Sequence, residues 1–477
     1  MSLGIDLQVM LPEIVIGAMA CVVLLAAAFD SDREQRLAYW LAQAALLAAL
    51  TTNTVGAGRE LQSAFGGMFL GDPMAVVLKS FVFAVAIVNL IYTRDYLRQR
   101  RLMTGEYFAL ALFAVLGMQI LISAGSLITV YLGLELLSLS LYSLVAMQRG
   151  SAVASEAAMK YFVLGAIASG VLLYGMSILY GLTGSLDLAA IAAGGASQGG
   201  DPLRVFALVF IVAGIAFKLG VAPFHMWLPD VYHGAPTSVT LFIATAPKLA
   251  AFAMAMRLVA DGLPGLAPEW QQMFAVLAIL SMAIGNLAAI AQDNIKRMLA
   301  YSTIAHMGFL LLGVLAASRD GYAGAMFYAI VYALMSMGAF GMIILLGRHD
   351  SESDRLADFR GLARRSPWFS LMMLILMFSL AGVPPFAGFW AKWFVLKETV
   401  AAGQVWLAAV AVGFSIIGAY YYLRIVKLMY FDPPEAAATP LAASADLRLT
   451  VSINGLVIFL LGIAPGLLMT VCLSALR

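Results

Sequence analysis

The chain has 477 residues, of which 63% are hydrophobic and only 11% are charged, and its mean hydropathy is +0.94. This composition excludes a water-soluble domain. A formal net charge of +2 without a long basic cluster also argues against a nucleic-acid partner. In a bilayer only helices and closed barrels satisfy their backbone hydrogen bonds. Because the apolar runs are long and lack the alternation of a barrel strand, we predict an all-α polytopic membrane protein.

A membrane-spanning helix needs roughly 20 mostly apolar residues, and fourteen segments of the chain approach this length. In chain order they cover residues 8–28, 37–55, 73–93, 107–123, 126–146, 157–180, 203–224, 237–259, 271–291, 299–316, 322–347, 367–396, 404–430 and 449–472. Residues 1–6 lack the basic region of a cleavable signal, so we expect the first segment to remain as a helix.

The distribution of basic residues predicts the orientation, because short cytoplasmic loops are enriched in Lys and Arg. Seventeen of the 28 Lys and Arg residues fall in or beside the odd-numbered loops, and six, Arg257 among them, fall in the even-numbered loops and at the C-terminus. This asymmetry predicts that both termini face the periplasm of a bacterial inner membrane.

The remaining five basic residues lie within predicted spans, and all are lysines: Lys79, Lys160, Lys218, Lys248 and Lys392. A charge at the centre of a membrane helix costs roughly 2.5 to 3.5 kcal/mol on insertion scales, so such residues are retained for a reason. A buried lysine can release its proton near neutral pH, whereas arginine stays protonated. The pattern therefore predicts a proton relay.

Among the acidic residues, Glu135 lies in the middle of the fifth span, whereas Glu13 lies close to a helix start. We expect Glu135 to pair with Lys218 on the seventh span, because opposite charges stabilise one another when they are shielded from lipid. Moving the two apart would then favour proton transfer. A static ion pair that fixes the helix register is the alternative.

Prolines accompany two of the lysines. Lys248 follows Pro247, and a proline inside a membrane helix frees a backbone carbonyl and lets water enter. We therefore interpret Lys248 as a proton carrier rather than a lysine that snorkels to the interface. Lys392 follows the pair Pro384 and Pro385 and is interpreted as the carrier on the exit side.

Two lysines and a histidine have less distinctive surroundings. For Lys160, a few residues inside its span, proton transfer and snorkelling are equally open, and for Lys79 we expect snorkelling. His306 lies in mid-span with hydroxyl neighbours and is a candidate proton-transfer group in a supporting role.

No metal or cofactor site is predicted on this chain. His225 and His233 flank a predicted loop at residues 227–230, but too few ligands surround them to hold a metal ion. The sequence has no phosphate loop, dinucleotide glycine motif or cysteine cluster, so we expect the chain to bind no nucleotide, flavin or iron–sulfur centre. We interpret Cys21 and Cys472 as structural.

A short motif occurs twice. Residues 220–224 (Gly-Val-Ala-Pro-Phe) on the seventh span match residues 382–386 (Gly-Val-Pro-Pro-Phe) on the twelfth, each with a lysine nearby. Because five spans separate them, the two units would have opposite orientation. Inverted repeats with interrupted helices are typical of transporters, whose site lies at the break. We predict discontinuous helices at both spans, with two ordinary proline kinks as the alternative.

Two longer motifs carry a family resemblance. Residues 218–232, followed by Ala235, Pro236 and Thr237, and residues 294–306 resemble the signature of the antiporter-like subunits of respiratory complex I. Lysine at position 392 is similar to the subtypes called L and N, whereas the M subtype has glutamate there. The chain ends soon after the last span, without the long lateral helix of L, so it resembles N most.

The resemblance implies a fold and a division of the chain. The family has two inverted five-helix repeats, here residues 106–260 and 261–430. Three helices precede them within residues 1–105, and a loop and helix follow within residues 431–477. In the family, NADH oxidation and quinone reduction occur on other subunits, which carry FMN and iron–sulfur clusters. The implied partners are the lipid bilayer and the other membrane-arm subunits, including the neighbouring antiporter-like subunit.

The resemblance also implies residue roles. Glu135 and Lys218 resemble the family's paired charge switch, Lys248 its central proton carrier, Lys392 its terminal carrier and Lys160 a supporting lysine. These roles imply one proton channel of a proton-translocating NADH:quinone oxidoreductase, without a redox site on this chain. Two alternatives stay open: a subunit of a multi-subunit cation/proton antiporter, and a structural spacer whose charges only fit neighbouring subunits together.

Overall fold

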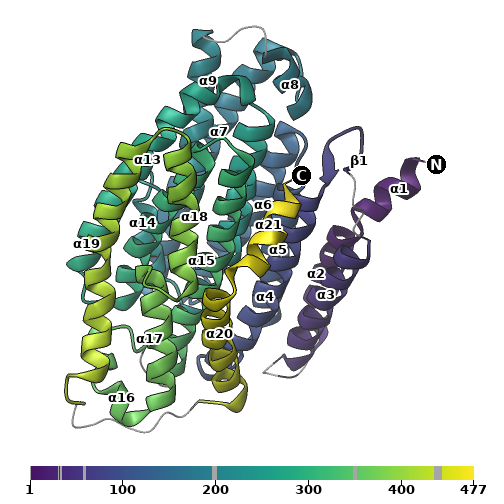
Figure 1. Cartoon of the computed structure of the whole chain (residues 1–477). Helices are drawn as coiled ribbons and strands as arrows, with labels where there is room; N and C mark the ends of the chain where they lie inside the picture. Colours follow the sequence, from purple (N-terminus) through teal and green to yellow (C-terminus); the bar gives the residue numbers. More distant parts are fainter. Residues whose placement is uncertain are drawn as a thin grey trace.

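The computed structural model describes residues 2–30, 32, 35–56, 61–195, 201–347, 352–434 and 443–476. The fold is helical, as predicted from the composition, and 82% of the described residues lie in helices. Figure 1 shows most of these helices running side by side along one direction, which is the arrangement of a bundle that crosses a membrane.

The described elements fall into three stretches of the chain. The first contains α1 (Ser2–Val9), α2 (Leu11–Phe29), α3 (Arg36–Val55), the antiparallel strands β1 (Gln62–Ala64) and β2 (Phe69–Gly71), α4 (Pro73–Gln99), α5 (Gly105–Ile122), α6 (Leu127–Val145) and α7 (Ala152–Thr183). The second contains α8 (Leu188–Gly195), α9 (Pro202–Leu219), α10 (Trp227–Gly234), α11 (Thr237–Ala244), α12 (Ala246–Ala255), the π-helix η1 (Met256–Asp261), the short 3-10 helix η2 (Pro264–Leu266), α13 (Ala267–Ile290), α14 (Ile295–Leu315) and α15 (Arg319–Leu346). The third contains η3 (Leu356–Phe359), α16 (Leu362–Arg365), α17 (Pro367–Ala381), α18 (Ala387–Ala401), α19 (Val405–Tyr430), α20 (Ala445–Ile463) and α21 (Pro465–Ala475).

Twelve helical segments among the described residues are long and apolar enough to cross a membrane, and each overlaps one predicted span. The two predicted spans outside this set are α3, a helix of 20 residues, and the twelfth span, which is divided into α17 and α18. The prediction of one continuous helix over residues 449–472 was wrong. The helix α20 ends at Ile463, and Pro465 begins α21 because proline fits the first turn of a helix and not its interior.

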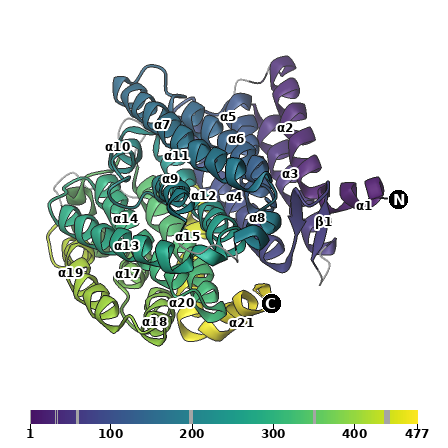
Figure 2. The same ribbon diagram turned by 90° about the horizontal axis from the view of Figure 1, so that it is seen from above.

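The most buried spans form the centre of the bundle. The span from Thr237 to Asp261, which includes α12, is buried along its whole apolar window, and α14 and α15 are almost as fully buried. Seen from above in Figure 2, α12 and α15 lie in the middle, while α2 and α3 lie at one edge and α19 at another. The helices that carry Lys248 and His306 are therefore shielded from lipid by the rest of the chain.

The expectation that Lys79 snorkels to the interface was wrong. Its ammonium lies 2.6 Å from the Oε1 of Glu13, and both side chains are less than 5% exposed. The Lys79 ammonium also lies 4.6 Å from the ring centre of Phe69 on β2. The partner on the adjacent helix α2 makes burial of the amine possible, because a buried charge is tolerated when it is paired.

Arg257, which the orientation rule assigned to a loop, is also buried. It lies in η1 and binds Asp72, the residue that caps α4, through two contacts of 2.7 and 2.9 Å. It also contacts Asp261 at 3.0 Å and donates to the Ile122 carbonyl at 3.0 Å. These contacts join the ends of α4, α5 and η1, so Arg257 has a structural role at this end of the bundle.

On the predicted cytoplasmic side, Glu352, which follows α15 in the chain, contacts three residues of the bundle. It contacts Lys296 at 2.9 Å and accepts hydrogen bonds from Thr237, at 2.6 Å, and from Tyr96. Burial by itself raises the pKa of this carboxyl, but the Lys296 ammonium and the hydrogen bonds outweigh burial and lower the pKa to about 2.

We expect Glu352→Gln to destabilise the chain by on the order of 3 kcal/mol at neutral pH, because one pKa unit corresponds to about 1.4 kcal/mol. The stabilisation comes from the ionised carboxylate, so it is fully present above about pH 4.5, the ordinary pKa, and is lost as pH falls through about 2. Thermal denaturation at pH 7, 5.5 and 3 tests this. The difference between wild type and variant should be equal at the first two values and smaller at pH 3; a difference that shrinks already at pH 5.5 contradicts it.

Candidate proton relay

The two helix breaks predicted from the repeated motif are present and have the same local geometry. The helices α9 and α17 each end in a glycine with left-handed backbone angles, φ 81° and ψ 35° at Gly220 and φ 85° and ψ 35° at Gly382. In both, the N–H groups of the glycine and of the following valine turn back to carbonyls of the last helical turn. This is the Schellman type of helix end.

A lysine binds the end of each broken helix. The ammonium of Lys248, on α12, donates to the Leu219 carbonyl at 2.9 Å, and the ammonium of Lys392, on α18, donates to the Ala381 carbonyl at 2.9 Å. The last carbonyls of a helix lack intrahelical partners and carry the negative end of the helix dipole. Each half-helix end therefore stabilises the protonated amine more than the neutral one.

Lys218 adjoins the first break, one residue before the carbonyl that Lys248 binds. It is buried, and its ammonium donates to Ser138 Oγ on α6 at 2.8 Å. Among the described residues no ion pair joins it to Glu135, whose Oε1 is buried and has no hydrogen-bond partner. The predicted contact between Glu135 and Lys218 is thus absent from this structure, and Ser138 takes its place.

Lys392 lies at the second break in a similar setting. Besides the Ala381 carbonyl it donates to Ser415 Oγ on α19 at 2.8 Å, and its amine lies 4.9 Å from the ring centre of Phe309. Its side chain is buried, so it does not snorkel.

His306 is placed close to Lys392, as a supporting role requires. Its Nδ1 lies 2.6 Å from the hydroxyl of Tyr328, and its Nε2 lies 3.0 Å from the hydroxyl of Tyr422, which in turn contacts Ser302. Imidazole and hydroxyl groups both donate and accept hydrogen bonds, so this chain of contacts can pass a proton by reversing its hydrogen bonds.

A small cavity of about 10 Å³, about the space of one water molecule, joins these groups. Lys392, His306, Ser415, Tyr421 and Tyr422 are among the residues that line it. The amine of Lys392 and the imidazole of His306 therefore border the same small space.

Lys160 is set apart from the buried amines. Its side chain is 43% exposed and contacts Glu156 at 2.8 Å and Asp230 at 2.7 Å, and Asp230 also binds Arg297 at 2.8 Å. The structure therefore leaves Lys160 on the surface in a network of charges.

The predicted loop between His225 and His233 was wrong, because residues Trp227–Gly234 form the helix α10. The indole of Trp227 donates to the Phe217 carbonyl at 3.1 Å, which draws α10 toward the end of α9. Within the described ranges, no group of three or more His, Cys, Asp or Glu side chains is arranged to hold a metal ion.

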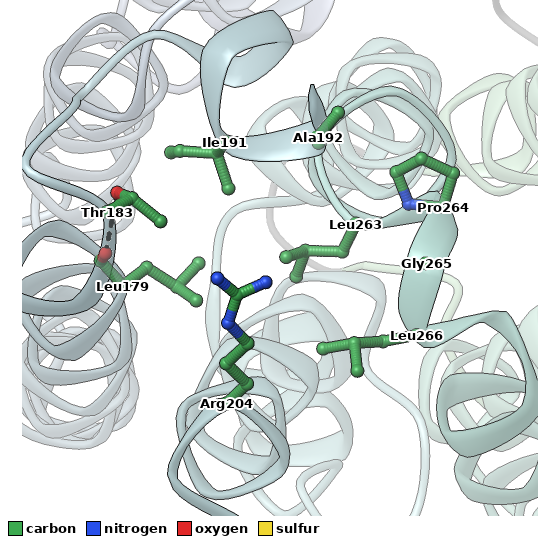
Figure 3. Close-up of a pocket in the computed structure, with 10 residues that line it drawn as sticks. Leu179, Thr183, Ile191, Ala192, Arg204, Leu263, Pro264, Gly265 and Leu266 are labelled. Atoms are coloured by element: carbon green, nitrogen blue, oxygen red, sulfur yellow. Dashed lines mark hydrogen bonds between the residues drawn. The ribbon is translucent and has the colours of Figure 1, made fainter. Parts of the chain in front are cut away.

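A second pocket lies at the predicted periplasmic end. Figure 3 shows the guanidinium of Arg204 between Leu179 on one side and Leu263 and Leu266 on the other. Arg204 comes from the first turn of α9 and donates to the Gly194 carbonyl at 3.2 Å. None of the five intramembrane lysines lines this pocket, so it is separate from the relay.

Sequence reasoning missed the hydroxyl partners of the lysines. The contact of Ser138 with Lys218 could have been predicted, because Ser138 lies three residues after Glu135 and so on the same helix face. The run of tyrosines that includes Tyr421 and Tyr422 in an otherwise apolar span was also a signal. Ser415 had none, since one serine in a membrane helix is common.

The shared geometry makes the glycine at the second break testable. A Cβ at Gly382 would lie 2.8 Å from Lys392 Cδ, and its φ of +85° is unfavourable for any other residue. We expect Gly382→Ala to cost at least about 1 to 2 kcal/mol, since the left-handed conformation alone costs that much. Thermal unfolding of the assembled complex measures it. The control is Gly413→Ala in α19, where a Cβ meets open space; equal stability of both variants contradicts the prediction.

Comparison with known proteins decides the family. The family described as NADH:quinone oxidoreductase/Mrp antiporter, transmembrane, matches residues 124–418, more than half of the chain. The chain belongs to this family. The matched region runs from the start of α6 into α19 and contains both helix breaks and the relay residues predicted from the sequence, whereas Tyr421 and Tyr422 lie just beyond it.

Relatives in the NADH:quinone oxidoreductase/Mrp antiporter family match over nearly the whole chain. NADH-quinone oxidoreductase subunit N of Thiobacillus denitrificans is 57% identical over 468 residues, which cover 98% of this chain and 96% of the relative. The protein of the same name from Nitrosomonas europaea is 53% identical over 467 residues and covers 98% and 97%.

Solved structures of the family share the fold. A chain of respiratory complex I from Thermus thermophilus with bound aureothin has a TM-score of 0.83 and 34% identity, covering 96% of this chain and 98% of that one. A chain of the Mrp complex from Dietzia sp. DQ12-45-1b has a TM-score of 0.84, covering 100% and 97%, but its 22% identity shows the fold alone.

Proposed function

We propose that the chain is a proton-translocating membrane-arm subunit of an NADH:quinone oxidoreductase. The observation that carries the proposal is the pair of lysines, Lys248 and Lys392, each buried against the end of a broken helix. The relatives named above, with more than half of their residues identical to this chain, support the respiratory complex rather than the Mrp antiporter.

In this proposal the proton passes between two clusters. Lys218 and Lys248 adjoin the first break, and Lys392 and His306 adjoin the second. Glu135 acts on Lys218 by its charge. When Lys218 leaves Ser138 and approaches Glu135, the repulsion between the Lys218 and Lys248 ammonium groups falls, so Lys248 holds its proton more readily. When Lys218 returns to Ser138 the repulsion rises again, and Lys248 gives up its proton toward Lys392. Lys160, with its exposed ion pairs, has a supporting role at the surface.

The proposed topology has fourteen spans, with both termini in the periplasm of a bacterial inner membrane. It counts α3 and the α17–α18 pair as spans besides the twelve apolar segments. Residues 106–260 and 261–430 form two inverted units, supported by the matching helix ends at Gly220 and Gly382. NADH, FMN, iron–sulfur clusters and quinone belong to other subunits, and the neighbouring membrane-arm subunits are the partners.

Pumping by the purified complex in liposomes tests the proposal. We expect NADH and a quinone to drive acidification of one compartment, which an uncoupler abolishes. A sodium or potassium gradient without NADH should drive no proton exchange. Exchange driven by salt alone would favour the antiporter instead.

A further inference from the structure

A cleft lies at the predicted cytoplasmic end of the second unit. It measures about 520 Å³, is open to solvent, and is lined by His233, Asp293, Asp354, Arg424 and Leu428 among others. With charged groups on most of its walls, the cleft is suited to hold water.

Residues about one turn apart on the same helix line the cleft and the cavity of Lys392. Both are lined by α19: Arg424 and Leu428 face the cleft, and Tyr421 and Tyr422 line the inner cavity. Three residues of a helix rise about 4.5 Å, so Tyr421 and Arg424 are separated by that distance along the axis. On α13, Asn286 lines the inner cavity and Asp293, just beyond the helix end, lines the cleft.

Polar side chains fill the region between the cleft and the inner cavity. The Tyr421 hydroxyl donates to Asn286 Oδ1 at 3.0 Å, and both side chains are buried. A Cβ at Gly418 would lie 2.4 Å from the same Oδ1, so glycine there makes room for the amide. Buried polar groups are costly in a membrane unless they form hydrogen bonds or serve a function such as contact with water.

Arg424 closes the end of this region that faces the cleft. Its guanidinium donates to the carbonyls of Ile290, at 3.3 Å, and Gln292, at 3.1 Å, and contacts Asp293 at 2.7 Å. These carbonyls belong to the last turn of α13 and the residues after it, so the side chain lies across the gap between α13 and α19.

We propose that cytoplasmic water reaches Lys392 from the cleft, between α13 and α19, past Arg424, Tyr421 and Asn286. Lys392, expected from the sequence to be the exit-side carrier, then has a cytoplasmic uptake route besides the path from Lys248. A neutral Lys392 amine takes a proton from a water in the inner cavity, and water in the cleft replaces that proton. The use of this route in pumping rests on the proposed function. The water path itself does not, because water can enter the cleft whether or not the chain pumps protons.

Silver-ion accessibility of an introduced cysteine tests the route without any measurement of pumping. The parent is the full complex with Cys21→Ser and Cys472→Ala, which removes both cysteines of this chain. Asn286→Cys is treated with silver ions in inside-out and in right-side-out vesicles, and the thiols that remain are labelled with a fluorescent maleimide after unfolding. Ala357→Cys, on the cleft wall, reports which side the cleft faces.

We expect silver to protect Asn286→Cys only from the side that also protects Ala357→Cys. Adding Arg424→Ala should speed this protection by about tenfold or more, because it removes the contacts of Arg424 across the gap and losing even one hydrogen bond of a charged group has an effect of that size. Ser415→Cys, in the same inner cavity, replaces Asn286→Cys should the latter not assemble. Protection only from the opposite side, or from neither side, overturns the proposal.

Leu287→Cys is the matched control. It adjoins Asn286 on α13, but its side chain is 57% exposed on the apolar outer face. We expect no protection there from either side. Equal protection of Leu287→Cys and Asn286→Cys overturns the route, since access would then not depend on the polar contact with α19.

Discussion

Replacing Lys248 with methionine is expected to abolish proton translocation through this chain while the complex still assembles. Methionine matches the length of lysine and packs among the apolar neighbours of α12, but it has no proton to carry and leaves the Leu219 carbonyl without its donor. A missing acid–base group typically slows a proton transfer by 10²–10⁴-fold, so we expect a fall of about that size in flux through this path.

Proton pumping per NADH oxidised, measured in liposomes alongside the amount of assembled complex, is the readout. Lys397→Met is the matched control, because Lys397 also lies in a membrane-associated helix, α18, but is 61% exposed. It should pump normally. Unchanged pumping by Lys248→Met would favour a structural spacer, and salt-driven exchange without NADH that is lost in this variant would favour an antiporter.

The depth of the lysines and the two helix breaks could be predicted because both are local properties of the sequence. A lysine in the middle of an apolar run has no route to water along its own helix. A Gly-Val-x-Pro segment favours a helix end, because glycine adopts the left-handed conformation easily and proline lacks an N–H group, and both segments of this kind end a helix here. Lys218, Lys248 and Lys392 are therefore buried as expected.

The partners of these lysines could not be predicted, because they depend on how the helices rotate against one another. Glu135 and Ser138 lie on the same face of α6, and the structure brings the serine and not the carboxylate to Lys218. The same holds for Lys79, which was expected at the interface. Nothing local to residues 73–93 indicates that α2 would place Glu13 beside it.

The pair of Glu13 and Lys79 gives the second large expected effect. Glu13→Gln should destabilise the chain by about 3–5 kcal/mol, because it leaves a buried ammonium without its counter-charge. The double variant Glu13→Gln with Lys79→Met should recover most of that loss, since it removes both charges from the low-dielectric interior. Thermal unfolding of the assembled complex measures both.

The exposed pair of Glu156 and Lys160 on α7 is the matched control. Its side chains are 66% and 43% exposed, and exposed ion pairs contribute little to stability, so Glu156→Gln should leave stability nearly unchanged. The expected difference depends on burial, because Lys79 is removed from water in the folded chain and the carboxylate 2.6 Å away is its counter-charge. A double variant as unstable as Glu13→Gln alone would show that the amine is stabilised by something other than Glu13.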